Sequence, residues 1–137
     1  MRPLPVVILC GGKGTRLKQL TEDVPKPLIE VGGRPILWHL MRFFAHQGHR
    51  EFILCLGYKG EAVKRWFMDH QPWMEAEDFT LTFSEDSRKV RTHSPSPEPM
   101  SREWTITFAG TGEETHTGGR IKKVERYVKG RPFLATY

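Results

Sequence analysis

Residues 4–16 read LPVVILCGGKGTR, and this stretch decides the fold class. Its first part, Leu4–Cys10, is a short continuous apolar run that stops at glycine, which is typical of a strand buried on both faces of a sheet. Its second part, Gly11–Arg16, is a polar loop that contains three glycines. A buried strand that runs into such a loop predicts an α/β protein whose ligand lies outside the carboxyl end of the strand.

The residues that follow predict an alternation of helix and strand. After a turn at Gly32 and Gly33, Pro35 stands where the first residue of a helix belongs, and Gly48 ends that helix. Its apolar stripe at helical spacing consists of Ile36, Leu37, Leu40, Met41 and Phe44. Residues 52–56 (FILCL) predict a second buried strand, followed by a turn at residues 57–60 and a short helix that carries Val63, Trp66 and Phe67. This order indicates a βαβ unit with parallel strands and a right-handed crossover.

The second half of the chain predicts further strands and one more helix. Residues 79–83 (FTLTF) and 104–108 (WTITF) alternate with period two, as half-exposed strands do. Residues 84–102 carry three prolines and many charges, and they predict a flexible loop. Apolar residues at 121, 124 and 128 mark one face of a basic helix, and residues 133–135 start a last strand.

The size and composition of the chain fit one globular domain over residues 1–137. The chain has a mass of 15.9 kDa, with 38% hydrophobic and 11% aromatic residues, which excludes wholesale disorder. No apolar run approaches the roughly 20 residues that cross a bilayer, and none resembles a secretory signal. We therefore expect a cytoplasmic protein without a membrane partner.

The two cysteines, Cys10 and Cys55, each lie inside an apolar run. This placement favours reduced, buried thiols over a secreted disulfide framework. A Cys10–Cys55 bridge is the alternative.

The net charge of +5 is unevenly placed along the chain. Residues 119–131 hold six basic residues against one acidic residue, whereas residues 61–87 hold two against seven. Neither an RRM signature nor a zinc-finger spacing occurs, so we expect no nucleic-acid partner. An anionic small molecule is the better candidate ligand.

The glycine-rich loop has the chemistry of a phosphate site. Its glycines let the backbone approach a ligand and leave N–H groups free for phosphate oxygens. It is neither a dinucleotide fingerprint, which would need glycine at Leu17, nor a P-loop. Alone, these glycines would equally fit a turn that merely leaves a strand.

Two basic residues favour the phosphate interpretation. Arg16 supplies a planar fork suited to bidentate phosphate binding, and Lys26 is a point charge between Pro25 and Pro27. In isolation, Lys26 would more simply be a solvated turn residue. Arg120, at the start of the basic helix, is the exception to an otherwise solvated charged face.

The loop and the segments after it resemble a known family. Residues 9–17 (LCGGKGTRL) and 25–28 (PKPL) resemble the signature of the sugar-phosphate nucleotidyltransferases. Residues 29–39 (IEVGGRPILWH), 57–60 (GYKG) and 117–124 (TGGRIKKV) are similar to the glucose-1-phosphate cytidylyltransferases in particular. The resemblance covers most of the chain and is weakest over residues 68–102.

The resemblance implies a fold and a reaction. The fold is the Rossmann-like three-layer α/β/α nucleotidyltransferase fold with a mostly parallel sheet. The reaction joins CTP and α-D-glucose 1-phosphate to give CDP-glucose and diphosphate with Mg²⁺, for bacterial surface polysaccharides such as lipopolysaccharide O-antigen. The alternatives are a uridylyl- or thymidylyltransferase and a non-catalytic nucleotide-binding module.

The resemblance also assigns roles to individual residues. Arg16 would hold the pyrophosphate leaving group, and Lys26 the α-phosphate together with the sugar phosphate, so these two are the expected catalytic residues. Cys10 stands where the family usually has alanine, and Lys13 at a position that varies. The full set expected to bind nucleotide or substrate is Leu9, Cys10, Gly11, Gly12, Lys13, Gly14, Thr15, Arg16, Lys26, Thr115 and Arg120.

The expected metal ligands do not lie among these residues. In the family, a strand resembling residues 133–137 runs into Gly-Asp-Gly, whose aspartate holds Mg²⁺. We therefore expect no metal ligand in this chain and place the expected ligands just after Tyr137. We also expect that these residues alone release no pyrophosphate from CTP and glucose 1-phosphate. His46 and His49 lack a third ligand and predict no zinc site. The resemblance further implies a homo-oligomer.

Overall fold

The computed structural model describes residues 2–11, 24–71, 77–93, 104–112 and 116–137. The chain divides into two compact units, which are described separately. The first comprises Met1–Lys64 and Glu103–Tyr137, and the second Arg65–Arg102.

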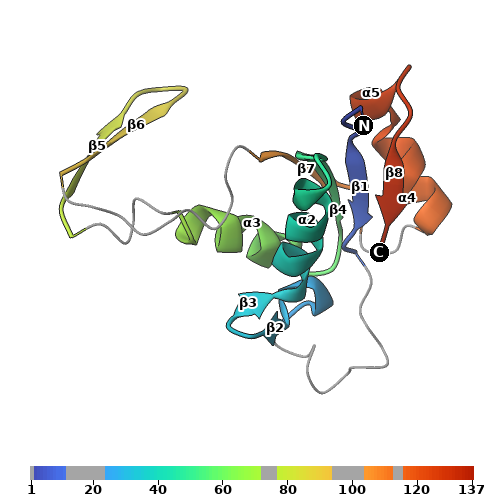
Figure 1. Cartoon of the computed structure of the whole chain (residues 1–137), viewed down its shortest axis with the longest axis horizontal. Helices are drawn as coiled ribbons and strands as arrows, with labels where there is room; N and C mark the ends of the chain where they lie inside the picture. Colours follow the sequence, from blue (N-terminus) through green and yellow to red (C-terminus); the bar gives the residue numbers. More distant parts are fainter. Residues whose placement is uncertain (1, 12–23, 72–76, 94–103, 113–115) are drawn as a thin grey trace. The chain divides into compact units, whose positions relative to one another are not determined.

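A four-stranded parallel sheet forms the centre of the first unit (Figure 1). The strand order is β7-β4-β1-β8, so the first strand along the chain lies inside the sheet. This arrangement confirms the predicted Rossmann-like fold and the parallel βαβ unit. The strands are β1 (Val6–Leu9), β4 (Glu51–Leu56), β7 (Thr105–Gly110) and β8 (Leu134–Thr136).

The two central strands are buried on both faces, as their continuous apolar runs predict. Val6, Val7 and Ile8 of β1 are at most 1% exposed, and β4 is similarly covered from Phe52 to Leu56. Burial of a Val, Leu, Ile or Phe side chain contributes roughly 1.5–3 kcal/mol. These two strands therefore supply much of the core that fixes the sheet.

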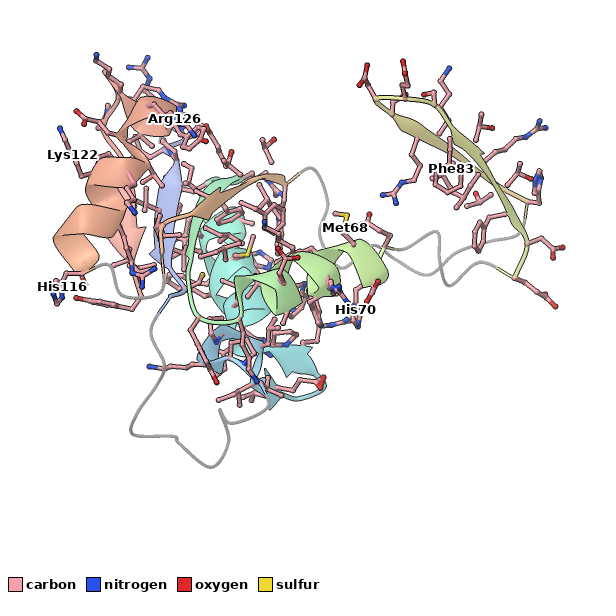
Figure 2. All side chains as sticks on the ribbon, turned by 180° about the vertical axis from the view of Figure 1, so that it is seen from behind. Met68, His70, Phe83, His116, Lys122 and Arg126 are labelled. Carbon is pink, nitrogen blue, oxygen red and sulfur yellow. The ribbon has the colours of Figure 1, made fainter. Side chains whose placement is uncertain are left out.

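Helices cover both faces of the sheet. Val7 and Ile53 pack with Val124 and Val128, so α4 (Thr117–Lys123) and α5 (Glu125–Val128) cover one face. In Figures 1 and 2 the sheet lies between this pair and α2 (Ile36–His46). The result is the predicted α/β/α layering.

The helix α2 differs in detail from its prediction. Pro35 is the N-cap residue, and the helix begins one residue later, at Ile36. Ile36 is 37% exposed, whereas Trp38, which the predicted apolar stripe omitted, is 6% exposed. Leu37 and Met41 of the predicted stripe are buried as expected, and the guanidinium groups of Arg34 and Arg42 lie 4.9 and 5.3 Å from the centre of the Trp38 ring.

A tight hairpin precedes α2. The short strands β2 (Glu30–Val31) and β3 (Arg34–Pro35) pair antiparallel across Gly32 and Gly33, whose φ angles are 62° and 82°. Two successive positive φ angles are accessible to glycine without strain, which explains the predicted turn at this point. The 3-10 helix η2 (Lys26–Leu28) lies before the hairpin.

The helix α3 (Gly60–Asp69) spans the division between the units, and the second unit also holds a β-hairpin. β5 (Phe79–Phe83) pairs antiparallel with β6 (Arg88–Thr92), so the prediction of a loop over residues 84–102 was wrong at 88–92. The charged residues of β6 show no apolar strand pattern in the sequence, because this strand is specified by its pairing with β5 rather than by burial. Phe83, labelled in Figure 2, is 74% exposed.

Candidate functional site

The carboxyl end of β1 lies at a reversal of the strand order. β4 flanks β1 on one side and β8 on the other, both parallel to it. In open α/β sheets, ligands bind outside the carboxyl ends of the strands at such a point. Leu9, Cys10 and Gly11 therefore lie at the end of the sheet where ligands bind in open α/β proteins.

The backbone continues in register beyond the end of β1. Leu9 lies beside Cys55, and the N–H of Cys10 donates to the carbonyl of Cys55 at 3.0 Å. This bond carries the sheet ladder up to the first glycine of the loop. Gly11 therefore begins from a fixed backbone position.

Arg120 lies buried beside Gly11, at the carboxyl end of β1, and this end of the sheet is called the corner below. Its side chain comes from α4 and is 5% exposed. Nη1 donates to the hydroxyl of Thr111 at 2.8 Å, and Nη2 donates to the carbonyl of Gly11 at 3.3 Å. The structure thus brings together two predicted site residues, Gly11 and Arg120, that lie far apart in the sequence.

Two glycines make room for the Arg120 guanidinium. A Cβ atom at Gly11 would overlap this group. A Cβ atom at Gly57, which follows β4, would lie 2.7 Å from Nη1. A Cβ at Gly11 would displace the guanidinium, and one at Gly57 would also lie 2.7 Å from the backbone oxygen of Gly112. The guanidinium lies where β1, β4 and β7 end.

Sequence reasoning missed Thr111, the residue that follows β7. It is 0% exposed, and both its N–H (2.8 Å) and its hydroxyl (3.0 Å) donate to the carbonyl of Leu56. Its own carbonyl accepts from Nζ of Lys123 at 3.0 Å. The only sequence signal was a threonine placed directly after a strand and before a glycine, which by itself indicates no site.

Lys26 lies in η2 with an exposed side chain. Pro25 before it is fully buried and fixes the backbone at this point. Figure 1 shows η2 toward the end of the sheet where β1 and β8 finish.

The remaining predicted site residues, Gly12, Lys13, Gly14, Thr15, Arg16 and Thr115, lie outside the described residues. Their roles stay predictions.

The two cysteines are free and buried, as predicted. Cys55 faces the α4–α5 side with Val7, and Leu9 packs against that cluster. The two thiols do not form a bridge, so the alternative of a Cys10–Cys55 disulfide is wrong. Burial raises the pKa of Cys55 to about 11 and the pKa of Cys10 beyond its usual range, so both thiols are neutral and neither serves as a thiolate nucleophile.

The rest of the basic helix is solvated, as predicted. Lys122 pairs with Glu125 at 2.7 Å, a hydrogen bond that raises the pKa of Lys122, and its side chain points away from the sheet (Figure 2). Arg126 is also exposed. Only Arg120 and Lys123 of α4 donate hydrogen bonds at the corner of the sheet, among the described contacts.

Neither a cluster of metal ligands nor a membrane-spanning helix occurs among the described residues. No group of three or more His, Cys, Asp or Glu side chains among these residues could hold a metal ion. None of the helices in the described ranges is both long and apolar enough to cross a bilayer.

The fold and the loop define a class of protein. The family model described as nucleotidyl transferase matches residues 5–92, and the chain belongs to this family. The match contains the strand β1, the glycine-rich loop and Lys26.

Particular relatives narrow the comparison. A probable glucose-1-phosphate cytidylyltransferase of Bacillus subtilis is 45% identical over 134 residues, which are 98% of this chain and 49% of that protein. The glucose-1-phosphate cytidylyltransferase of Salmonella typhimurium is 42% identical over 135 residues, with the same coverage. The chain spans about half the length of the curated relatives it matches.

A solved structure supports the fold over nearly the whole chain. HddC from Yersinia pseudotuberculosis, complexed with GMP-PN, aligns with a TM-score of 0.65 at 28% identity. The alignment covers 96% of this chain and 46% of that one.

Proposed function

We propose that this chain forms the nucleotide-binding part of a glucose-1-phosphate cytidylyltransferase. The reaction would join CTP and α-D-glucose 1-phosphate to give CDP-glucose and pyrophosphate. The observation that carries the proposal is the corner at Gly11, where the glycine-rich loop leaves a parallel sheet at its strand-order reversal. The names of the two cytidylyltransferase relatives supply the choice of base and sugar.

The chemistry demands neutralisation of charge rather than covalent catalysis. A phosphate oxygen of the sugar phosphate attacks the α-phosphorus of CTP, the bond to the β-phosphate breaks, and pyrophosphate leaves with the electron pair. Two anions must approach each other, so positioning and positive charge dominate the catalysis. The neutral thiols of Cys10 and Cys55 take no part as nucleophiles.

The residues would divide this work between them. Amides of the loop from Leu9 to Arg16 would hold the base, the ribose and the triphosphate, with Arg16 on the pyrophosphate. Lys26 would bind the α-phosphate and the sugar phosphate, and its exposed ammonium is available for this. Thr115 and Arg120 would complete the nucleotide site. Mg²⁺ and a homo-oligomer, which the resemblance implies, belong to the same proposal.

Calorimetry of the purified chain with CTP, UTP and dTTP tests the proposal. We expect CTP to bind most tightly. Tighter binding of UTP or dTTP would overturn the choice of base, and binding of none of the three would overturn nucleotide binding. A pyrophosphate-release assay with CTP and glucose 1-phosphate tests the expectation that these residues alone do not turn over.

A further inference from the structure

Thr111 uses every hydrogen-bonding group it has at the corner of the sheet. Its hydroxyl proton goes to the carbonyl of Leu56 at 3.0 Å, so the oxygen presents its lone pairs to Nη1 of Arg120 at 2.8 Å. A hydroxyl is a donor and an acceptor at once, and valine, of similar shape, is neither. The direction of the hydroxyl proton therefore determines where the guanidinium lies.

The Arg120 guanidinium connects Thr111, which follows β7, with Gly11, which follows β1. Nη2 donates to the carbonyl of Gly11 at 3.3 Å, while Gly57 leaves the space that Nη1 fills. A buried guanidinium is costly unless its donors are used. Since Thr111 occupies one of those donors, it stabilises the geometry in which another reaches Gly11.

Lys123 secures Thr111 from the same helix. Its Nζ donates to the Thr111 carbonyl at 3.0 Å, one turn beyond Arg120 on α4. Arg120 and Lys123 of α4 thus both donate hydrogen bonds to Thr111. Thr111 in turn donates two hydrogen bonds to the carbonyl of Leu56. The helix is docked through Thr111 onto the end of the sheet.

We propose that Thr111 is a positioning residue for the nucleotide site, and the proposal rests on the function proposed above. Its hydroxyl holds Arg120 against the Gly11 carbonyl. Thr111 thereby helps to fix the Gly11 carbonyl at the carboxyl end of β1 before the ligand arrives, which lowers the ordering cost of binding.

Two substitutions at Thr111 separate the hydroxyl from the shape of the side chain. Thr111→Val keeps the shape and removes the hydroxyl, whereas Thr111→Ser keeps the hydroxyl. In ¹⁵N NMR spectra of the ligand-free chain, we expect the Arg120 Nε–H signal to exchange slowly in the wild type and in Thr111→Ser, and to lose this protection in Thr111→Val. If circular dichroism shows that Thr111→Val is unfolded, Thr111→Ala replaces it in the comparison with Thr111→Ser.

Calorimetry with CTP supplies the second readout. We expect Thr111→Val to weaken CTP binding about tenfold, and Thr111→Ser to stay within about twofold of the wild type. Val128→Ala, a core change in α5, matches the loss of stability and should leave the affinity unchanged. Equal weakening by Val128→Ala, or unchanged Arg120 protection and CTP affinity in Thr111→Val, would overturn the role of Thr111.

The two readouts distinguish the two proposals. A wild-type chain that does not bind CTP overturns the proposed function. In that case the role of Thr111 in the nucleotide site is also overturned. The NMR signal still shows whether the Thr111 hydroxyl holds Arg120 in place.

Discussion

Nδ1 of His49 accepts a hydrogen bond from the backbone N–H of Leu4, with 3.0 Å between the two nitrogens. His49 is 2% exposed and follows the end of α2, while Leu4 lies just before β1. An accepting Nδ1 leaves the ring proton on Nε2 of a neutral imidazole. The contact ties the entry of β1 to the turn that leads into β4.

We expect His49→Phe to lower the free energy of unfolding by about 1–3 kcal/mol, because the Leu4 amide loses its partner in a part-buried place. Urea denaturation followed by circular dichroism measures this loss. His46→Gln, an exposed change at the end of α2, is the matched control and should stay within about 0.5 kcal/mol. Equal stability of the two variants would contradict the assigned role.

Gly11→Ala should be destabilising by about 1–3 kcal/mol, because the new Cβ would overlap the buried Arg120 guanidinium. Gly118→Ala is the control, since a Cβ there meets nothing within 4 Å and the residue lies in α4. Alanine in a helix is favoured over glycine by up to about 1 kcal/mol, so the control should be neutral or stabilising. Thermal unfolding of both variants decides the matter, and a Gly11→Ala chain as stable as the control would show that Arg120 lies elsewhere.

The buried thiols predict a loss of stability at alkaline pH. An unfolded cysteine has a pKa near 9, whereas burial raises that of Cys55 to about 11. Between these values the unfolded chain releases a proton that the folded chain keeps, so rising pH favours unfolding. The stabilisation is complete below about pH 9 and declines toward pH 11, by up to about 1.4 kcal/mol per pH unit for each thiol.

Urea denaturation under reducing conditions measures this effect between about pH 8 and 11. The chain with Cys10→Ala and Cys55→Ala should show a shallower decline than the wild type, because the tyrosines and lysines titrate in both. Identical slopes would mean that the thiols are accessible in the folded chain. A thiol reagent at neutral pH gives an independent check, since both cysteines should react only after unfolding.

The regular part of the fold could be predicted because its signals are local. The continuous apolar runs of β1 and β4 and the glycine pair at Gly32 each specify their own structure within a few residues. The strand β6 could not be predicted in this way. Its residues Arg88–Thr92 are mostly exposed, and only their partners in β5 specify the pairing.

The candidate site shows the same limit. Gly11 and Lys26 could be proposed as site residues because the glycines beside a strand and the lysine between prolines match a family motif in the sequence itself. Thr111 was missed because its role depends on Leu56, Arg120 and Lys123, which only the fold brings together. Arg120 was expected beside the ligand, and its contacts with Thr111 and Gly11 within the protein could not be predicted from the sequence.

Lys26→Ala should weaken CTP binding without changing stability. A hydrogen bond to a charged group contributes about 1.5–3 kcal/mol, so the dissociation constant should rise about tenfold or more. The side chain is exposed, so the melting temperature should stay unchanged. Lys89→Ala, an equally charged and exposed change in β6, should alter neither quantity. Wild-type affinity in Lys26→Ala would remove Lys26 from the site.

The pairing of β1 with β8 has a consequence for synthesis on the ribosome. Val6 lies beside Leu134, and Ile8 beside Thr136, so one side of an early strand stays without its partner until almost the whole described sequence has been made. Contacts between residues so distant in sequence form slowly, because chain entropy is lost before they form. During that interval the unpaired backbone N–H and C=O groups on that edge of β1 are open to pairing with other nascent chains. The pairing of the strand that carries the candidate site is therefore completed only after β8 has been made.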